Sequence, residues 1–205
     1  MDGRTRRAEE RRRERRAQLL SAATQVIAER GYANTSVDDV IKAAGVSRGT
    51  FYLYFESRDA LFAELLDDFL GKLGSTVEII GLEDRDPTGS LFDNFKRVIE
   101  LLATHRNLTK VLFREAVGLS ESIDQRVNGF YDFLYAMVVG ALRKGVTRQI
   151  IREVDEATLA PAIVGCVKEV IRARIVAGEG EVDAEELTTA IFDFALNGLR
   201  LSPVR

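Results

Sequence analysis

The sequence has few of the side chains that build metal sites, disulfides and many active sites. Its 205 residues include one cysteine, Cys166, one histidine, His105, and no tryptophan. A single cysteine excludes an internal disulfide framework, and so few His and Cys residues argue against a metal site, so we expect no metal and no cofactor. The sequence also has no glycine-rich phosphate loop and no HExxH or GxSxG motif, so we expect no enzymatic activity.

Long hydrophobic runs are missing as well. No apolar stretch approaches the ~18 to 20 residues of a membrane-spanning helix, and the N-terminus lacks the apolar core of a signal peptide. We therefore expect a cytoplasmic protein without a membrane partner. Three prolines, 8% aromatic residues and helical periodicity along the chain predict an all-α fold. The length allows one large or two small domains.

A net charge of −3 gives no indication of a nucleic-acid partner, but the charge is unevenly distributed. Residues 1–60 carry 12 basic and 9 acidic side chains, whereas residues 61–205 carry 17 basic and 23 acidic ones. Eight arginines lie in residues 1–16, the basic N-terminal arm. The arm is either a disordered tail or an extension of the first helix. It either contacts DNA, along the phosphates or in the adjacent minor groove, or remains solvated.

Residues 35–58 predict two short helices joined by a tight turn. Apolar residues at i, i+3, i+4 and i+7 over 37–44 indicate a helix with one buried face. Ser36 is placed to cap its start, with Asp39 in a capping-box position. Gly45 is placed to end it in the left-handed region that glycine enters at low cost. Helix, glycine turn and helix form the geometry that presents a recognition helix to the major groove.

The second helix of this pair is capped by Ser47 and keeps Phe51 and Phe55 on one face. Its other side carries groups suited to DNA, because arginine bonds guanine bidentately and hydroxyls bond phosphate. The alternative is a helical hairpin whose tyrosines pack against a neighbour and whose Arg48 is solvated. The residues expected to contact DNA are Thr35, Ser47, Arg48, Gly49, Thr50, Tyr52, Tyr54 and Arg58.

The segments AERGYANTSVDDV, AAGVSRGTFYLYF and ESRDALF, within residues 17–65, resemble the DNA-binding domain of the TetR family of bacterial transcriptional regulators. Arg58 and Asp59 stand where the family more often has Lys-Glu, which keeps the charge signs. Leu53 takes a place that is often polar, which removes one phosphate contact. The resemblance implies a three-helix helix-turn-helix DNA-binding domain over 17–60 and a helical domain for effector binding and dimerisation over 61–205.

Helical periodicity predicts the remaining elements. The first helix should run over about 11–30, and a fourth should begin after Ser57 and lead out of the DNA-binding domain. Residues 81–89 indicate a linker, because glycines flank an Asp-Pro pair. Further helices are expected at about 90–105, 107–118, 122–145, 155–178 and 183–200. Pro161 requires that Thr158 cap its helix or that the helix bend there.

The last two helices are apolar around most of their circumference, so they must be covered on most sides. Either a second subunit covers part of them or the chain buries them itself. The resemblance favours a homodimer, since TetR-like regulators pair through a four-helix bundle of these two helices. Such a dimer would place two recognition helices ~34 to 36 Å apart on palindromic double-stranded DNA. The expected interface residues are Ile163, Val167, Val170, Ile171, Ile191, Phe194 and Leu199.

Aromatic and methionine side chains of the middle helices either line a pocket or fill the core. The resemblance implies an effector cavity there, with a lining that differs between members. The expected ligand residues are Phe95, Phe113, Arg114, Val117, Phe130, Phe133, Leu134 and Met137. We therefore expect a ligand-responsive dimeric repressor that binds a palindromic operator and is released by a small, largely apolar effector. The alternatives are a constitutive DNA-binding protein without an effector and an enzyme with an appended DNA-binding domain.

Overall fold

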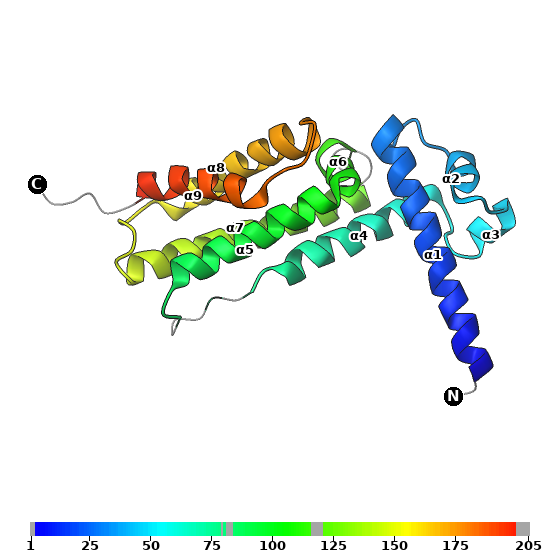
Figure 1. Cartoon of the computed structure of the whole chain (residues 1–205), viewed down its shortest axis with the longest axis horizontal. Helices are drawn as coiled ribbons and strands as arrows, with labels where there is room; N and C mark the ends of the chain where they lie inside the picture. The colour runs from blue at the N-terminus through cyan, green and yellow to red at the C-terminus, as the bar shows by residue number, and fades with distance from the viewer. Residues whose placement is uncertain (1–2, 79, 81–83, 116–120, 200–205) are drawn as a thin grey trace, which may run out of the picture.

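The computed structural model of the chain describes residues 3–78, 80, 84–115 and 121–199. The expected all-α fold is confirmed for these residues (Figure 1). In chain order the helices are α1 (Gly3–Arg30), α2 (Val37–Ala44), α3 (Arg48–Tyr52), α4 (Arg58–Thr76), α5 (Pro87–Thr104), α6 (Arg106–Glu115), α7 (Glu121–Thr147), α8 (Glu156–Ile171), a π-helical turn (Arg172–Val176) and α9 (Ala184–Leu199).

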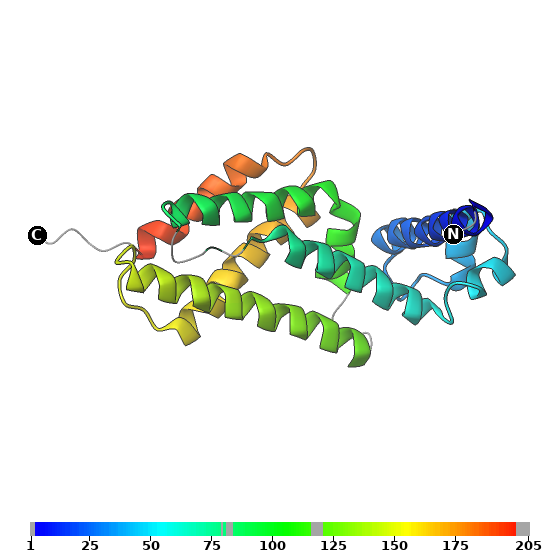
Figure 2. The ribbon, with the colours of Figure 1, turned by 90° about the horizontal axis from the view of Figure 1, so that it is seen from below.

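The helices form a small group at one end of an elongated molecule and a larger group along the rest of it. Figure 1 shows α1, α2 and α3 together at one end, with the N-terminal half of α1 projecting past the other two. Helix α4 leads from this group into the larger one, where it packs against α5 and α7. Figure 2 looks almost along α1, whose first residues point towards the viewer.

One hydrophobic core runs through both groups. Its fully buried members include Leu19 of α1, Phe51 of α3, Phe62 of α4, Val111 of α6 and Ile175 of the π-helical turn. Helix α1 packs against α6 as well as against α2 and α4. The two groups therefore share one continuous interior, in which the side chains of α1, α4 and α6 are packed together.

Local signals set the helix ends in the small group, as expected. Ser36 and Ser47 accept hydrogen bonds from backbone N–H groups of the first turns of α2 and α3, and Ser57 does the same for α4. Gly31 and Gly45 have φ of +82° and +63°, a region that costs other residues roughly 1 to 2 kcal/mol. Caps and glycine stops depend on neighbours in sequence, which is why the pattern located them.

The first helix begins earlier than expected, at Gly3 and not near residue 11. Residues 5–18 are mainly Arg, Glu and Ala, which all have high helix propensity. Arg6 and Glu10, one turn apart, approach to 3.6 Å. From Gly3 onward the basic arm is therefore the first part of α1 and not a disordered tail.

Helix α8 is capped by Asp155, one turn before Thr158. The Asp155 carboxylate accepts hydrogen bonds from the Ala157 N–H at 3.1 Å and from the Thr158 hydroxyl at 2.6 Å. Pro161 therefore lies inside the helix.

The chain leaves the π-helical turn at Gly178, where a Cβ atom would lie 2.4 Å from the Arg174 carbonyl oxygen.

Candidate DNA-binding site

Helix α3 presents an exposed polar face beside a buried aromatic one. Phe51 is fully buried, whereas Ser47, Arg48 and Gly49 are exposed and Tyr52 is half exposed. Thr50 is partly exposed, and its hydroxyl lies 2.8 Å from that of Ser47. The buried face fixes the helix and leaves the opposite face free for a partner. The alternative of a helical hairpin with packed tyrosines does not hold for Tyr52, whose side chain is half exposed.

Among the residues that the structure describes, the Arg48 side chain is held only by a surface ion pair. Its Nη2 atom donates to Asp38 at 3.3 Å, and the two side chains are 64% and 70% exposed. Exposed pairs contribute ~0 to 1 kcal/mol, so a partner with phosphates or base edges can replace this contact at little cost. Leu53, directly after the helix, is 76% exposed, and Tyr54 is partly exposed.

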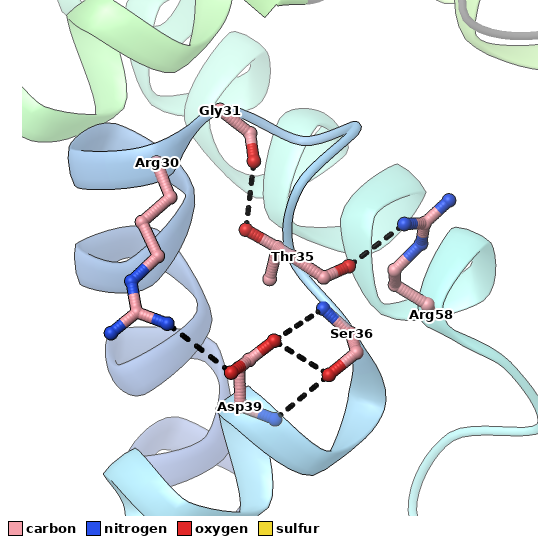
Figure 3. A network of polar contacts seen from close by, with 6 residues as sticks. All are labelled: Arg30, Gly31, Thr35, Ser36, Asp39 and Arg58. Atoms are coloured by element: carbon pink, nitrogen blue, oxygen red, sulfur yellow. Dashed lines mark hydrogen bonds and ion pairs between the residues drawn. The ribbon is translucent and has the colours of Figure 1, made fainter.

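Thr35 does not share this exposed face. It is 1% exposed, and its hydroxyl donates to the Gly31 carbonyl oxygen at 2.8 Å (Figure 3). Next to it, the Ser36 amide and hydroxyl donate to Asp39 at 2.8 and 2.6 Å, which lowers the pKa of that carboxyl. Arg30 adds a bond to Asp39 at 3.2 Å. Thr35 therefore shapes the loop before α2 and is not placed to touch DNA.

Arg58 was also expected at the DNA, and the structure gives its guanidinium another position. Its Nη1 atom donates to the carbonyl oxygens of Tyr32 and Thr35 at 3.2 and 2.8 Å, the latter drawn in Figure 3. Its Cζ atom lies 4.1 Å from the centre of the Tyr32 ring. The Tyr32 hydroxyl donates to Asp59, and burial with this bond raises the pKa of Tyr32 to about 12. Arg58 thus fastens the start of α4 to the loop between α1 and α2.

Two further contacts fix α1 on the helix-turn-helix. Arg16 donates two hydrogen bonds to the Glu64 carboxylate of α4, and its Cζ atom lies 4.9 Å from the centre of the Phe55 ring. Gln18 donates to the Ala44 carbonyl oxygen, at the end of α2, at 2.6 Å. The orientation of α1 relative to α2 and α4 is therefore set by polar contacts as well as by the core.

Two family descriptions match the chain. Residues 19–65 match that of bacterial regulatory proteins of the tetR family, and residues 84–199 match a tetracyclin repressor-like C-terminal domain. The chain belongs to the TetR family. The protein is thus a transcriptional regulator and not an enzyme, and α2 and α3 lie within the residues that match the tetR family description.

Individual TetR-family relatives match over nearly the whole chain. The fatty acid metabolism regulator protein of Bacillus subtilis is 25% identical, covering 89% of this chain and 94% of that protein. The HTH-type transcriptional regulator TtgR of Pseudomonas putida is 28% identical, covering 97% of each. The solved structure of the fatty acid degradation regulator FadR of Bacillus halodurans is 26% identical, with a TM-score of 0.73 over 91% of this chain and 96% of that one.

The residues expected at a dimer interface divide between the inside and the outside of the chain. Ile171 and Ile191 are 4% and 9% exposed and belong to the main core, so they face inward in this chain. Ile163, Val167 and Val170 are partly buried, Phe194 is 72% exposed, and the Leu199 side chain lies outside the described residues. Small exposed residues, which the sequence analysis did not single out, accompany Phe194 on the outer faces of α8 and α9: Ala162, Gly165, Ala190 and Gly198.

The residues expected around an effector are spread over α5, α6 and α7. Phe95, Phe113 and Phe130 pack partly buried against the main core, and Leu134 and Met137 are partly buried as well. Phe133 is 44% exposed. The side chain of Arg114 and all of Val117 lie outside the described residues. The structure thus shows how the three phenylalanines pack against the core, and the effector-binding role of these residues stays a prediction.

Two buried polar atoms, one on α9 and one on α5, could not be identified from the sequence. The Thr188 hydroxyl is fully buried, and neither it nor the buried Nε atom of Arg97 has a hydrogen-bond partner among the described residues. Phe92 and Phe95 of α5 contact Phe192 of α9, with ring centres 5.3 and 6.0 Å apart. Buried polar groups are rarely left unpaired, so the Thr188 hydroxyl is unused hydrogen-bonding capacity on the helix that also carries Phe192. No periodicity in the sequence identifies such a group.

The described residues hold no cluster of three or more His, Cys, Asp or Glu side chains arranged for a metal ion. None of their helices is long and apolar enough to cross a membrane.

We predict that Arg58→Ala destabilises the full-length protein by about 1 to 3 kcal/mol, because two bonds to carbonyl oxygens and the contact with Tyr32 are lost. Arg58→Lys should recover only part of this, since an ammonium group lacks the planar fork. Urea unfolding followed by circular dichroism measures both. A change below about 0.5 kcal/mol for Arg58→Ala would show that the contacts of Arg58 with the loop before α2 do not contribute this stability.

Proposed function

We propose that this protein is a dimeric repressor that binds a palindromic operator and is released by a small, largely apolar effector. Residues 17–60 would bind DNA, after a basic arm over 1–16, and residues 61–205 would bind the effector and dimerise. The observation that carries the proposal is the exposed polar face of α3, held in place by a buried aromatic face and by capped neighbouring helices. Chromosomal DNA as partner places the protein in the cytoplasm.

In this proposal Arg48 reads a base, and the hydroxyl side chains beside it contact phosphate. Arginine bonds guanine O6 and N7 bidentately, which gives sequence preference. Ser47, Thr50, Tyr52 and Tyr54 would position the helix on the backbone. A Cβ atom at Gly49 would meet only the Ser47 hydroxyl, at 3.9 Å, so packing within the chain does not require glycine at this position. Glycine there would instead allow the backbone of α3 to approach DNA closely.

Dimerisation through the outer faces of α8 and α9 follows from what these faces expose. Ala162, Gly165 and Ala190 are small and allow helices to approach closely, and Phe194 would bury a large apolar surface against a partner helix. One short recognition helix binds weakly alone, whereas two in a C2 dimer read both halves of a palindrome.

The proposed effector lies among α5, α7 and α9. Aromatic rings there would cover an apolar chain, and the unpaired Thr188 hydroxyl could bond a polar group of the effector. Two relatives, from Bacillus subtilis and Bacillus halodurans, are described as regulators of fatty acid metabolism or degradation. We therefore take a long-chain fatty acyl thioester as the first effector to test.

Release from DNA would pass through α4 and α6. Helix α4 begins at Arg58, whose guanidinium bonds the loop before α2, and it packs against α5 and α7, while α6 packs against α1. An effector that binds one arrangement of α5 and α7 more tightly than the other would bias the position of α4, and hence the spacing of the two α3 helices.

Arg48→Ala should weaken binding to the operator by ~1 to 3 kcal/mol and relax preference at one base position, because the bidentate contact is lost. Competition anisotropy with a duplex recovered by in vitro selection, and with a random duplex, measures both effects. Lys42→Ala, which removes an exposed cation of α2, is the control and should change the two affinities alike. Equal losses on both duplexes for Arg48→Ala would exclude Arg48 as a base reader.

Phe194→Asp should convert the dimer to monomers, because the dimer would bury the added carboxylate in an apolar interface. Sedimentation velocity measures the change, and the monomer should lose its preference for the whole palindrome over a half-site. Leu91→Asp, at a 37% exposed apolar position of α5, is the control and should remain dimeric. A wild-type chain that sediments as a monomer would contradict the proposed interface.

A long-chain acyl-CoA should release the protein from its operator, with a shift in apparent affinity of roughly 5-fold or more. Thr188→Val should weaken this response without lowering stability, because it removes an unpaired buried hydroxyl at nearly constant volume. Anisotropy and thermal unfolding measure the two effects. If acyl-CoA has no effect and native mass spectrometry finds no co-purified small molecule, the protein binds DNA constitutively.

A further inference from the structure

Helix α1 carries apolar residues along one side of its C-terminal half and arginines along the same side of its N-terminal half. Leu19, Ala22, Ala23 and Val26 are buried against the core. One and two turns earlier on the same side of the helix lie Arg15, Arg12 and Arg11, followed by Ala8. All four are exposed. A helix face that would carry apolar side chains in a longer bundle thus carries positive charge.

This arginine face and the end of α3 line one surface hollow of about 710 Å³. Its walls are Ala8, Arg11, Arg12, Glu14, Arg15 and Gln18 of α1, together with Leu53 and Tyr54. Figure 1 shows this half of α1 projecting beyond α2 and α3. The hollow therefore opens next to the recognition face and is not a separate site elsewhere on the protein.

The arginines of the hollow keep their charge available. Within the described residues Arg11 and Arg12 make no ion pair or side-chain hydrogen bond, and Arg15 bonds only the neutral amide of Gln18, at 2.7 Å. Arg16, on the adjacent edge, is occupied by Glu64. Glu14 is the acidic side chain among the residues that line the hollow. Three cations against one anion favour a polyanion as the occupant.

We propose that this hollow, the arginine cradle of Arg11, Arg12, Arg15, Leu53 and Tyr54, holds the sugar-phosphate backbone that flanks the half-site read by α3. The inference rests on the proposed DNA-binding function and adds a second, sequence-independent contact to each subunit. Arg11 and Arg15 are one turn apart, ~6 Å along the helix, which fits about two phosphates at ~3.4 Å of axial rise per nucleotide.

The rigid form of the arm decides how it meets DNA. An α-helix with its side chains is ~10 to 12 Å wide, whereas the minor groove is ~6 Å wide, so this arm does not enter the groove as an extended arm does. It lies instead along the backbone. The exposed apolar Leu53, where a hydroxyl would favour phosphate, fits a position that contacts the deoxyribose between phosphates.

The test compares two triple variants of the full-length protein that remove the same charge. Arg11→Gln with Arg12→Gln and Arg15→Gln neutralises the cradle. Arg6→Gln with Arg7→Gln and Arg13→Gln neutralises exposed arginines outside the hollow. Glutamine has nearly the helix propensity of arginine, and circular dichroism confirms that α1 persists in both.

Binding of each variant to the selected palindromic duplex is measured over a range of salt concentrations. Each lost phosphate contact lowers the slope of log K against log salt by about 0.9, and a dimer carries two cradles. The cradle variant should lose ~2 to 5 in slope and roughly tenfold or more in affinity at low salt, whereas the control variant should lose less than ~1 in slope. On a duplex trimmed to the bases read by α3, the two variants should become equal.

Equal slopes for the two variants on the full duplex would overturn the proposal and leave the arm a diffuse positive charge. A wild-type protein that selects no sequence would instead refute the proposed operator recognition. In that case the same two variants are compared on a random duplex of equal length, where the cradle still predicts the larger loss of slope for its own variant.

Discussion

The joint between Arg58 and the loop before α2 is the contact on which the arrangement of the DNA-binding end depends. A single guanidinium bonds the carbonyl oxygens of Tyr32 and Thr35 and covers the Tyr32 ring, whose hydroxyl is bonded to Asp59. These contacts join the backbone of the loop between α1 and α2 to the first side chains of α4, Arg58 and Asp59. The start of α4 is therefore tied to the loop that precedes α2 and α3. The proposed release mechanism requires such a connection, because a displacement of α4 by a ligand has to reach α3.

The same end of the molecule combines a specific and a non-specific element. The exposed face of α3 carries the groups that we propose to read base edges, while α1 adds a rigid row of cations beside it. Phosphate contacts supply most of the affinity and base contacts most of the discrimination. Because Arg16 and Gln18 fix α1 to α4 and α2, any motion of α4 would also move the arginine cradle.

Much of the small group could be predicted, because its signals are local. The capping box of Ser36 and Asp39 and the glycine stop at Gly45 act within one helical turn, and the structure has them where the pattern indicated. The burial of Thr35 and the inward bonds of Arg58 could not be predicted for the complementary reason. Their partners lie in a loop 4 to 26 residues away, and sequence spacing does not tell whether a polar side chain turns outward or bonds a carbonyl oxygen.

The sequence by itself determined most of the helices, the caps of α2, α3 and α4 and the helix-turn-helix motif, because periodicity, capping and glycine conformation are properties of short segments. Only the tertiary structure decided which apolar faces stay uncovered: Ile171 and Ile191 turned inward, while Phe194 stayed outside. It also decided that the arginines of the arm stand across a hollow from Tyr54. Both outcomes depend on the angles at which helices pack, and those angles are set by side chains far apart in the chain.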